Sequence, residues 1–76
     1  MVVRVYSTPA CPNCVLAKRF LQEKGIEFEE VNVAEDEVSA ALMIARTSQR
    51  TVPVIEVGDE WIVGFDKRKL ERALGI

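Results

Sequence analysis

Both cysteines of the chain lie in one short segment, Cys11-Pro12-Asn13-Cys14. An apolar stretch typical of a strand precedes this segment, and a stretch with helical periodicity follows it. The unpaired N–H groups at a helix start carry a partial positive charge, which favours a thiolate over a thiol. The first cysteine is therefore placed to act as a nucleophile. The second, one helical turn further on, is within reach to form a disulfide with it.

Structural disulfides and metal sites also use this spacing. A disulfide between cysteines so close in sequence encloses too short a loop to restrict the unfolded chain much, so it adds little stability. The pair supplies two of the four ligands of an ordinary zinc site, and the chain has no histidine and no third cysteine. A metal centre would need two chains to share ligands. We therefore favour redox chemistry and expect no metal site within one chain.

Length and charge restrict the function further. The 76 residues fit a single domain over 1–76, and a net charge of −2 gives no electrostatic support for nucleic acid binding. No apolar run approaches the roughly 20 residues that cross a bilayer. The first residues lack the basic leader and apolar region of a signal peptide. We expect a cytoplasmic monomer with neither nucleic acid nor membrane as a partner.

Apolar periodicity and turn residues predict seven elements. Strands are expected over 2–6, 27–32, 52–57 and 60–63, and helices over 12–24, 35–45 and from the N-cap Asp66 to Gly75. In the second helix, Val38, Ala41, Leu42 and Ala45 share one apolar face, and Met43 and Ile44 are expected to be in the core or half-buried.

The element order is therefore β-α-β-α-β-β-α. A right-handed crossover makes the first two strands parallel, and the Gly58-Asp59 turn makes the last two antiparallel. This order predicts an α/β fold with a four-stranded mixed sheet and helices on both faces.

The C-P-x-C segment, together with Thr51-Val52-Pro53 before a hairpin, resembles a minimal glutaredoxin of the thioredoxin fold over essentially the whole chain. The resemblance implies a thiol–disulfide oxidoreductase that acts on protein disulfides. It also implies a cis peptide bond before Pro53, which exposes the backbone of Val52 to a substrate chain.

In the implied reaction, Cys11 attacks a substrate disulfide and Cys14 then attacks Cys11, releasing the reduced substrate. No cofactor is bound. The external reductant is either glutathione or an NADPH-dependent flavoprotein resembling thioredoxin reductase.

Two branches of the family differ in that reductant. Glutathione-dependent members have Tyr after the motif's Pro, and a Gly-Gly followed soon by Asp-Asp. This chain has Asn13 and Val63-Gly64-Phe65-Asp66-Lys67, so Val63 and Lys67 depart from the pattern. NrdH-type redoxins, which behave as thioredoxins, carry W-S-G-F. Trp61 to Phe65 is similar, with one additional residue that moves Trp61 to the other face of its strand.

We favour the NrdH-type branch. The expected substrate-binding residues surround the cysteines: Pro12, Asn13, Thr51, Val52, Pro53, Gly64, Phe65 and Asp66. The resemblance also suggests that Lys18 adds positive potential near the thiolates. A non-enzymatic alternative is a dimeric module that holds an iron–sulfur cluster between two Cys11 residues, with glutathione completing the ligation.

Overall fold

The computed structural model describes residues 2–76 and contains the predicted order of elements. The elements are β1 (Val3–Ser7), α1 (Pro12–Glu23), β2 (Glu29–Asn32), α2 (Glu37–Thr47), β3 (Val54–Val57), β4 (Glu60–Val63) and α3 (Lys67–Leu74).

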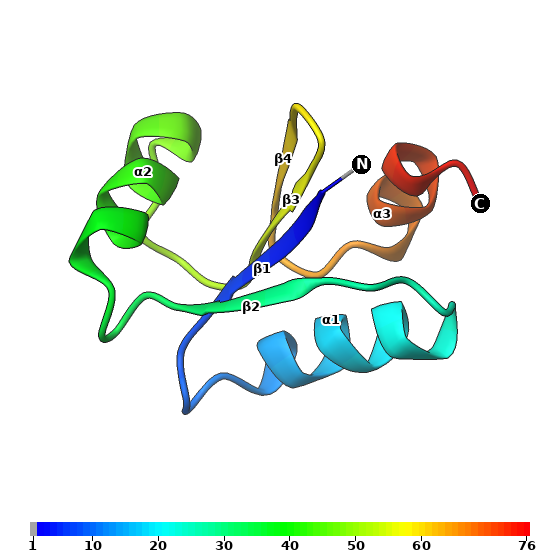
Figure 1. Ribbon diagram of the computed structural model, residues 1–76, viewed down its shortest axis with the longest axis horizontal. Coiled ribbons are helices and arrows are strands. Elements are labelled where there is room, and N and C mark those ends of the chain that lie inside the picture. Colours follow the sequence, from blue (N-terminus) through cyan, green and yellow to red (C-terminus); the bar gives the residue numbers. More distant parts are fainter. Residues whose placement is uncertain (1) are drawn as a thin grey trace.

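One four-stranded sheet runs through the molecule in the order β2-β1-β3-β4 (Figure 1). β1 pairs in parallel with β2, whereas β3 is antiparallel to both β1 and β4. The mixed sheet confirms the α/β expectation. It also places β1 in the interior of the sheet, which explains why its sequence is dominated by apolar residues.

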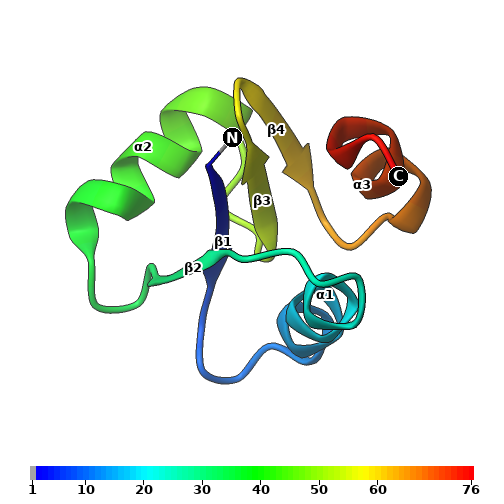
Figure 2. The ribbon, with the colours of Figure 1, turned by 45° about the vertical axis from the view of Figure 1, so that its right-hand side comes forward.

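The helices cover the sheet on both sides, as expected. α1 and α3 lie on one face, where Val5, Leu21, Ile55 and Leu70 are fully buried. α2 lies on the other face, where Met43 packs with Tyr6 and Val54. Figure 2 shows α2 separated by the sheet from the other two helices. The active dithiol at the start of α1 is therefore anchored in the larger of the two cores.

Each helix begins at a residue whose side chain accepts a backbone N–H from three positions further on. These N-caps are Cys11, Asp36 and Asp66. Gly25 and Gly75, with φ of 70° and 74°, follow the ends of α1 and α3 in the left-handed region that a terminating helix favours. The sequence-predicted N-cap Asp66 and the terminating glycines are confirmed.

The apolar face that the spacing of α2 identifies does not point into the core, whereas Met43 and Ile44 are buried and half-buried as expected. Val38, Ala41, Leu42 and Ala45 are all exposed, and Val38 is 82% exposed. The buried residue is Met43, flanked by the half-buried Ile44. Because α2 is apolar on two sides, its period predicts a helix but leaves two possible rotations about the helix axis.

Several element boundaries also shift. β2 begins at Glu29 rather than Glu27, and β3 at Val54 rather than Val52, because Val52 and Pro53 precede the ladder. In α1, the apolar Val15 and Leu16 are 47% and 42% exposed, so they lie outside the core.

A hydrogen-bonded network crosses the α2 face of the sheet. Tyr6 is 2% exposed, and its hydroxyl donates a hydrogen bond to Glu56 at 2.8 Å. The guanidinium of Arg4 donates hydrogen bonds to both Glu56 and Glu29. The ring of Trp61 packs 5.3 Å from that of Tyr6 between centroids. Burial is the larger cause, and the hydrogen bond to Glu56 the next, of a rise in the pKa of Tyr6 to about 12.

We expect the phenol of Tyr6 to ionise near pH 12, measured by phenolate absorbance, which is unambiguous because the chain has one tyrosine. A raised folded-state pKa stabilises the fold fully below the unfolded value of about 10 and loses that contribution as pH rises toward 12. As the pH rises from about 10 to about 12, the denaturant concentration at the unfolding midpoint should therefore fall for the wild type relative to Tyr6→Phe. Ionisation near pH 10 in the folded protein would contradict the network's role.

Candidate active site

Three segments meet at one end of the sheet because of strand register. Tyr6 in β1 pairs with Val54 in β3, and Val54 pairs with Val63 in β4. The chain that leaves β1, the chain that enters β3 and the chain that leaves β4 are therefore neighbours. Gly64 N–H donates to the carbonyl of Pro53 at 2.8 Å, which joins two of these segments directly.

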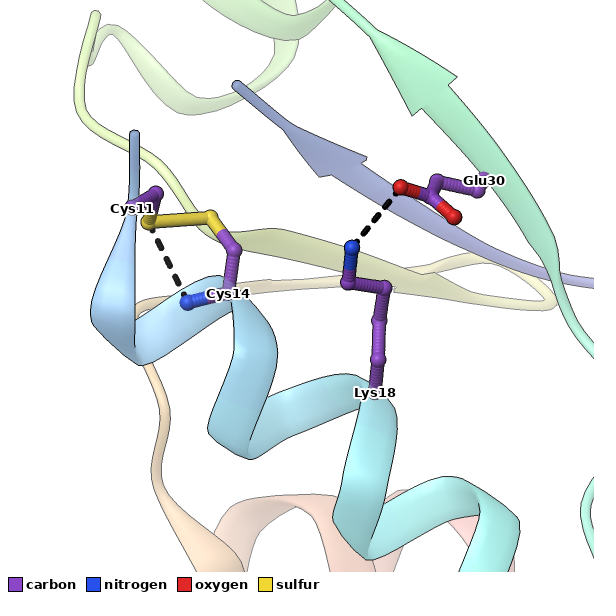
Figure 3. Close-up of a disulfide and its surroundings, with 4 residues drawn as sticks. All are labelled: Cys11, Cys14, Lys18 and Glu30. Carbon is purple, nitrogen blue, oxygen red and sulfur yellow. Dashed lines mark hydrogen bonds and ion pairs between the residues drawn. A yellow bond between two sulfur atoms is a disulfide. The ribbon is translucent and has the colours of Figure 1, made fainter. Parts of the chain in front are cut away.

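The dithiol lies where the chain leaving β1 enters α1. Cys11 is the N-cap in an extended conformation, and Pro12 occupies the first turn, where a missing N–H has no cost. The Cys14 N–H donates to Cys11 Sγ at 3.1 Å, and the two side chains form a disulfide with Cα atoms 5.2 Å apart (Figure 3). The sulfur of Cys11 thus occupies the place of an oxygen cap, where backbone N–H groups stabilise negative charge.

The two cysteines differ in exposure. Cys14 is fully buried on the core face of α1, whereas Cys11 is partly exposed at the helix tip. Pro12 and Asn13 are exposed between them. Cys11 is therefore the more accessible of the two cysteines from solvent.

The peptide bond between Val52 and Pro53 is cis, as predicted. Pro53 is buried, Val52 is half-buried and Thr51 is exposed, so this segment forms a border between core and surface beside the dithiol.

The chain after β4 completes the same end of the sheet. Gly64 has a φ of 82°, and Phe65 packs edge-on against Phe20 of α1 with ring centroids 6.0 Å apart. Asp66 Oδ1 accepts the Lys69 N–H at 3.2 Å and so caps α3. Trp61 lies on the α2 face against Tyr6, on the strand face opposite to the one that the W-S-G-F spacing would give.

Lys18 is engaged by a carboxylate rather than free beside the sulfurs. Its Nζ donates to Glu30 Oε1 at 2.7 Å, and its side chain leaves the same side of α1 as that of Cys14 (Figure 3). This partner on β2 was not predicted, because no local sequence signal relates a helix lysine to a strand glutamate.

Over residues 2–76, no group of three or more histidine, cysteine or acidic side chains is arranged to hold a metal ion. Within the same range, no helix is both long and apolar enough to span a bilayer.

Apolar side chains near the dithiol were also missed. Val15, Leu16 and Val63 are 47%, 42% and 39% exposed. Val15 directly follows Cys14 in the chain, and Val63 precedes Gly64. The rotation of α1 and the edge position of β4 leave these apolar side chains facing solvent.

Comparison with known proteins agrees with this geometry. The family model described as Glutaredoxin matches residues 3–62. A glutaredoxin-like 8.6 kDa protein from the rubredoxin operon of Clostridium pasteurianum is 38% identical over 73 residues, covering 96% of this chain and 97% of that protein.

Two solved structures share the fold over nearly the full length. A variant of the thioredoxin-like protein BC3987 aligns with a TM-score of 0.91 and 30% identity, covering 97% of this chain and 95% of that one. The glutaredoxin-like NrdH-redoxin of Escherichia coli, described as having a thioredoxin-like activity profile, aligns with a TM-score of 0.87 and 29% identity. The alignment covers 95% of this chain and 93% of that one.

We expect the Cys11 thiolate to persist at lower pH than an ordinary thiol, because it replaces an oxygen cap at a helix start. In Cys14→Ser, the rate of alkylation by iodoacetamide should reach half its maximum well below about pH 8.5, the ordinary thiol value. A free cysteine peptide serves as the control. A rate that rises only above that pH would contradict the expected stabilisation.

Proposed function

The chain belongs to the glutaredoxin family and is a thiol–disulfide oxidoreductase, and from that premise we propose that it reduces protein disulfides with electrons from NADPH through a flavoprotein of the thioredoxin-reductase type. The observation that carries this proposal is the segment from the end of β4 to the start of α3, where Val63 and Lys67 replace the glycine and aspartate of the glutathione-dependent pattern.

Charge at this segment opposes glutathione binding. The resemblance implies that an acidic pair beside the helix start engages the ammonium end of glutathione. Here the Asp66 carboxylate caps α3, and the exposed Lys67 follows it. Two like unit charges at about 4 Å repel by about 1 kcal/mol in water and more near a protein surface. Val63, 39% exposed, also carries a side chain where the glutathione-dependent pattern has a glycine that lets the backbone of glutathione approach.

Exposed apolar side chains near the dithiol suit a protein substrate. Val15, Leu16 and Val63 offer apolar contact area that a small, charged tripeptide would use poorly, whereas a protein surface could bury it. The thioredoxin-like activity profile described for the NrdH-redoxin of E. coli supports the same choice.

The proposed reaction is a two-electron exchange in two steps. The Cys11 thiolate attacks one substrate sulfur, forming a mixed disulfide and releasing the other substrate sulfur as a thiolate. The Cys14 thiolate then attacks Cys11 Sγ, which releases the second substrate thiolate and leaves the Cys11–Cys14 disulfide. The substrate becomes a dithiol, and the reductase returns two electrons to the protein.

The surrounding residues are proposed to bind the substrate chain. It would lie across Pro12 and Asn13, along the backbone of Thr51, Val52 and Pro53, and against Gly64, Phe65 and Asp66. One chain supplies the complete dithiol, so we propose the monomer as the catalytic unit, with no bound cofactor. We place it in the cytoplasm, where cellular reductants keep such dithiols reduced.

A reduction assay with two electron sources tests the donor. With NADPH and thioredoxin reductase, we expect steady turnover of a protein disulfide, at least about tenfold faster than with glutathione and glutathione reductase; tenfold corresponds to about 1.4 kcal/mol. In the double variant Val63→Gly/Lys67→Asp, the glutathione-linked rate should rise. Arg72→Asp, an equal charge change in the last turn of α3, should leave that rate unchanged.

Turnover with glutathione alone would overturn the proposed donor. Turnover with neither donor, together with a coloured cluster in anaerobically purified protein, would favour the iron–sulfur module and overturn the enzymatic proposal.

A further inference from the structure

The outward side of α2 carries an apolar stripe that the described part of the chain leaves exposed in part or almost entirely. Val38, Ala41, Leu42 and Ala45, here named the outer stripe, lie at the spacing of one helix face, and all four are exposed. Val38 is 82% and Leu42 41% exposed. A helix on a protein surface normally presents polar residues outward, so an outward apolar face indicates a binding surface.

We propose that the outer stripe is the self-association surface of this protein, where α2 packs antiparallel against α2 of a second copy about a two-fold axis. A two-fold interface requires a surface complementary to itself. With the axis between Ala41 and Leu42, each of these residues meets its own counterpart. Val38 near one end then lies opposite the partner's Ala45 near the other, so a larger side chain faces a small one at both ends.

Charge selects the antiparallel orientation. The acidic residues Glu35, Asp36 and Glu37 gather at the N-terminal end of α2, whereas Arg46 lies in its last turn and Arg50 in the loop beyond. None of the ion pairs among residues 2–76 involves these groups. An antiparallel pair brings the acidic end of one helix to the basic end of the other. A parallel pair would bring acid to acid and base to base.

The arrangement leaves the dithiol accessible. α2 covers one face of the sheet, and α1, which carries Cys11 and Cys14, covers the other (Figure 2). Two complete catalytic units can therefore associate without either blocking the other. One helix stripe is a small interface, so the association is weak and depends on concentration.

Sedimentation equilibrium under reducing conditions with a chelator tests the surface. Disulfide-linked and metal-linked dimers are excluded there. We expect the mean mass to rise toward twice 8.5 kDa as concentration increases from about 10 μM to about 1 mM, the range of weak association. Leu42→Glu places two like charges across the axis and should keep the protein monomeric. Leu16→Glu, a leucine of nearly equal exposure on α1, is the matched control and should dimerise as the wild type does.

Cross-linking in a Cys11→Ser/Cys14→Ser background tests the orientation. Oxidation of a mixture of Val38→Cys and Ala45→Cys chains should yield a mixed dimer, with either chain alone yielding at least about tenfold less, because the two positions face each other only across antiparallel helices. A wild-type protein that stays monomeric throughout, or a dimer that survives Leu42→Glu, would overturn the proposed surface. Efficient cross-linking of Val38→Cys with itself would overturn the antiparallel arrangement.

Discussion

The pairing of β1 with β3 is the constraint on which the rest of the structure depends. Its register sets Tyr6 opposite Val54, and this one alignment brings the end of β1 and the start of β3 together. Because side chains alternate along a strand, a slip by one residue would turn Val5 and Ile55 from the core toward the opposite face. The same slip would separate Cys11 from Pro53. Burial of the two apolar faces therefore fixes the active-site geometry.

α1 connects that core to the chemistry. Its inner face, with Ala17 and Leu21 fully buried, fixes the rotation of the helix and so buries Cys14 one turn before Ala17. Cys11, at the cap, is left at the surface with the Cys14 N–H directed at its sulfur. The difference in exposure between the two cysteines thus follows from packing, and it supports the proposed roles of Cys11 in attack and Cys14 in resolution.

The sequence predicted what depends on local signals. Caps, terminating glycines and alternation identified the order of elements, and C-P-x-C with T-V-P identified the family and the cis bond before Pro53. The sequence did not predict contacts between residues that are far apart along the chain. Two apolar sides on α2 left its rotation open; the face that includes Leu42 lies at the surface, and the side with Met43 is buried. The pairing of Lys18 with Glu30 depends on how α1 lies over β2, which no local pattern encodes.

The division of roles between the cysteines is the central claim, and trapping a mixed disulfide with a protein substrate tests it most directly. Without the resolving thiol, Cys14→Ser should accumulate a covalent complex with a disulfide-containing substrate, detectable by intact mass under non-reducing conditions. Cys11→Ser should accumulate little, because the Cys14 sulfur is buried. A complex that forms equally well with Cys11→Ser, or only with it, would contradict the account.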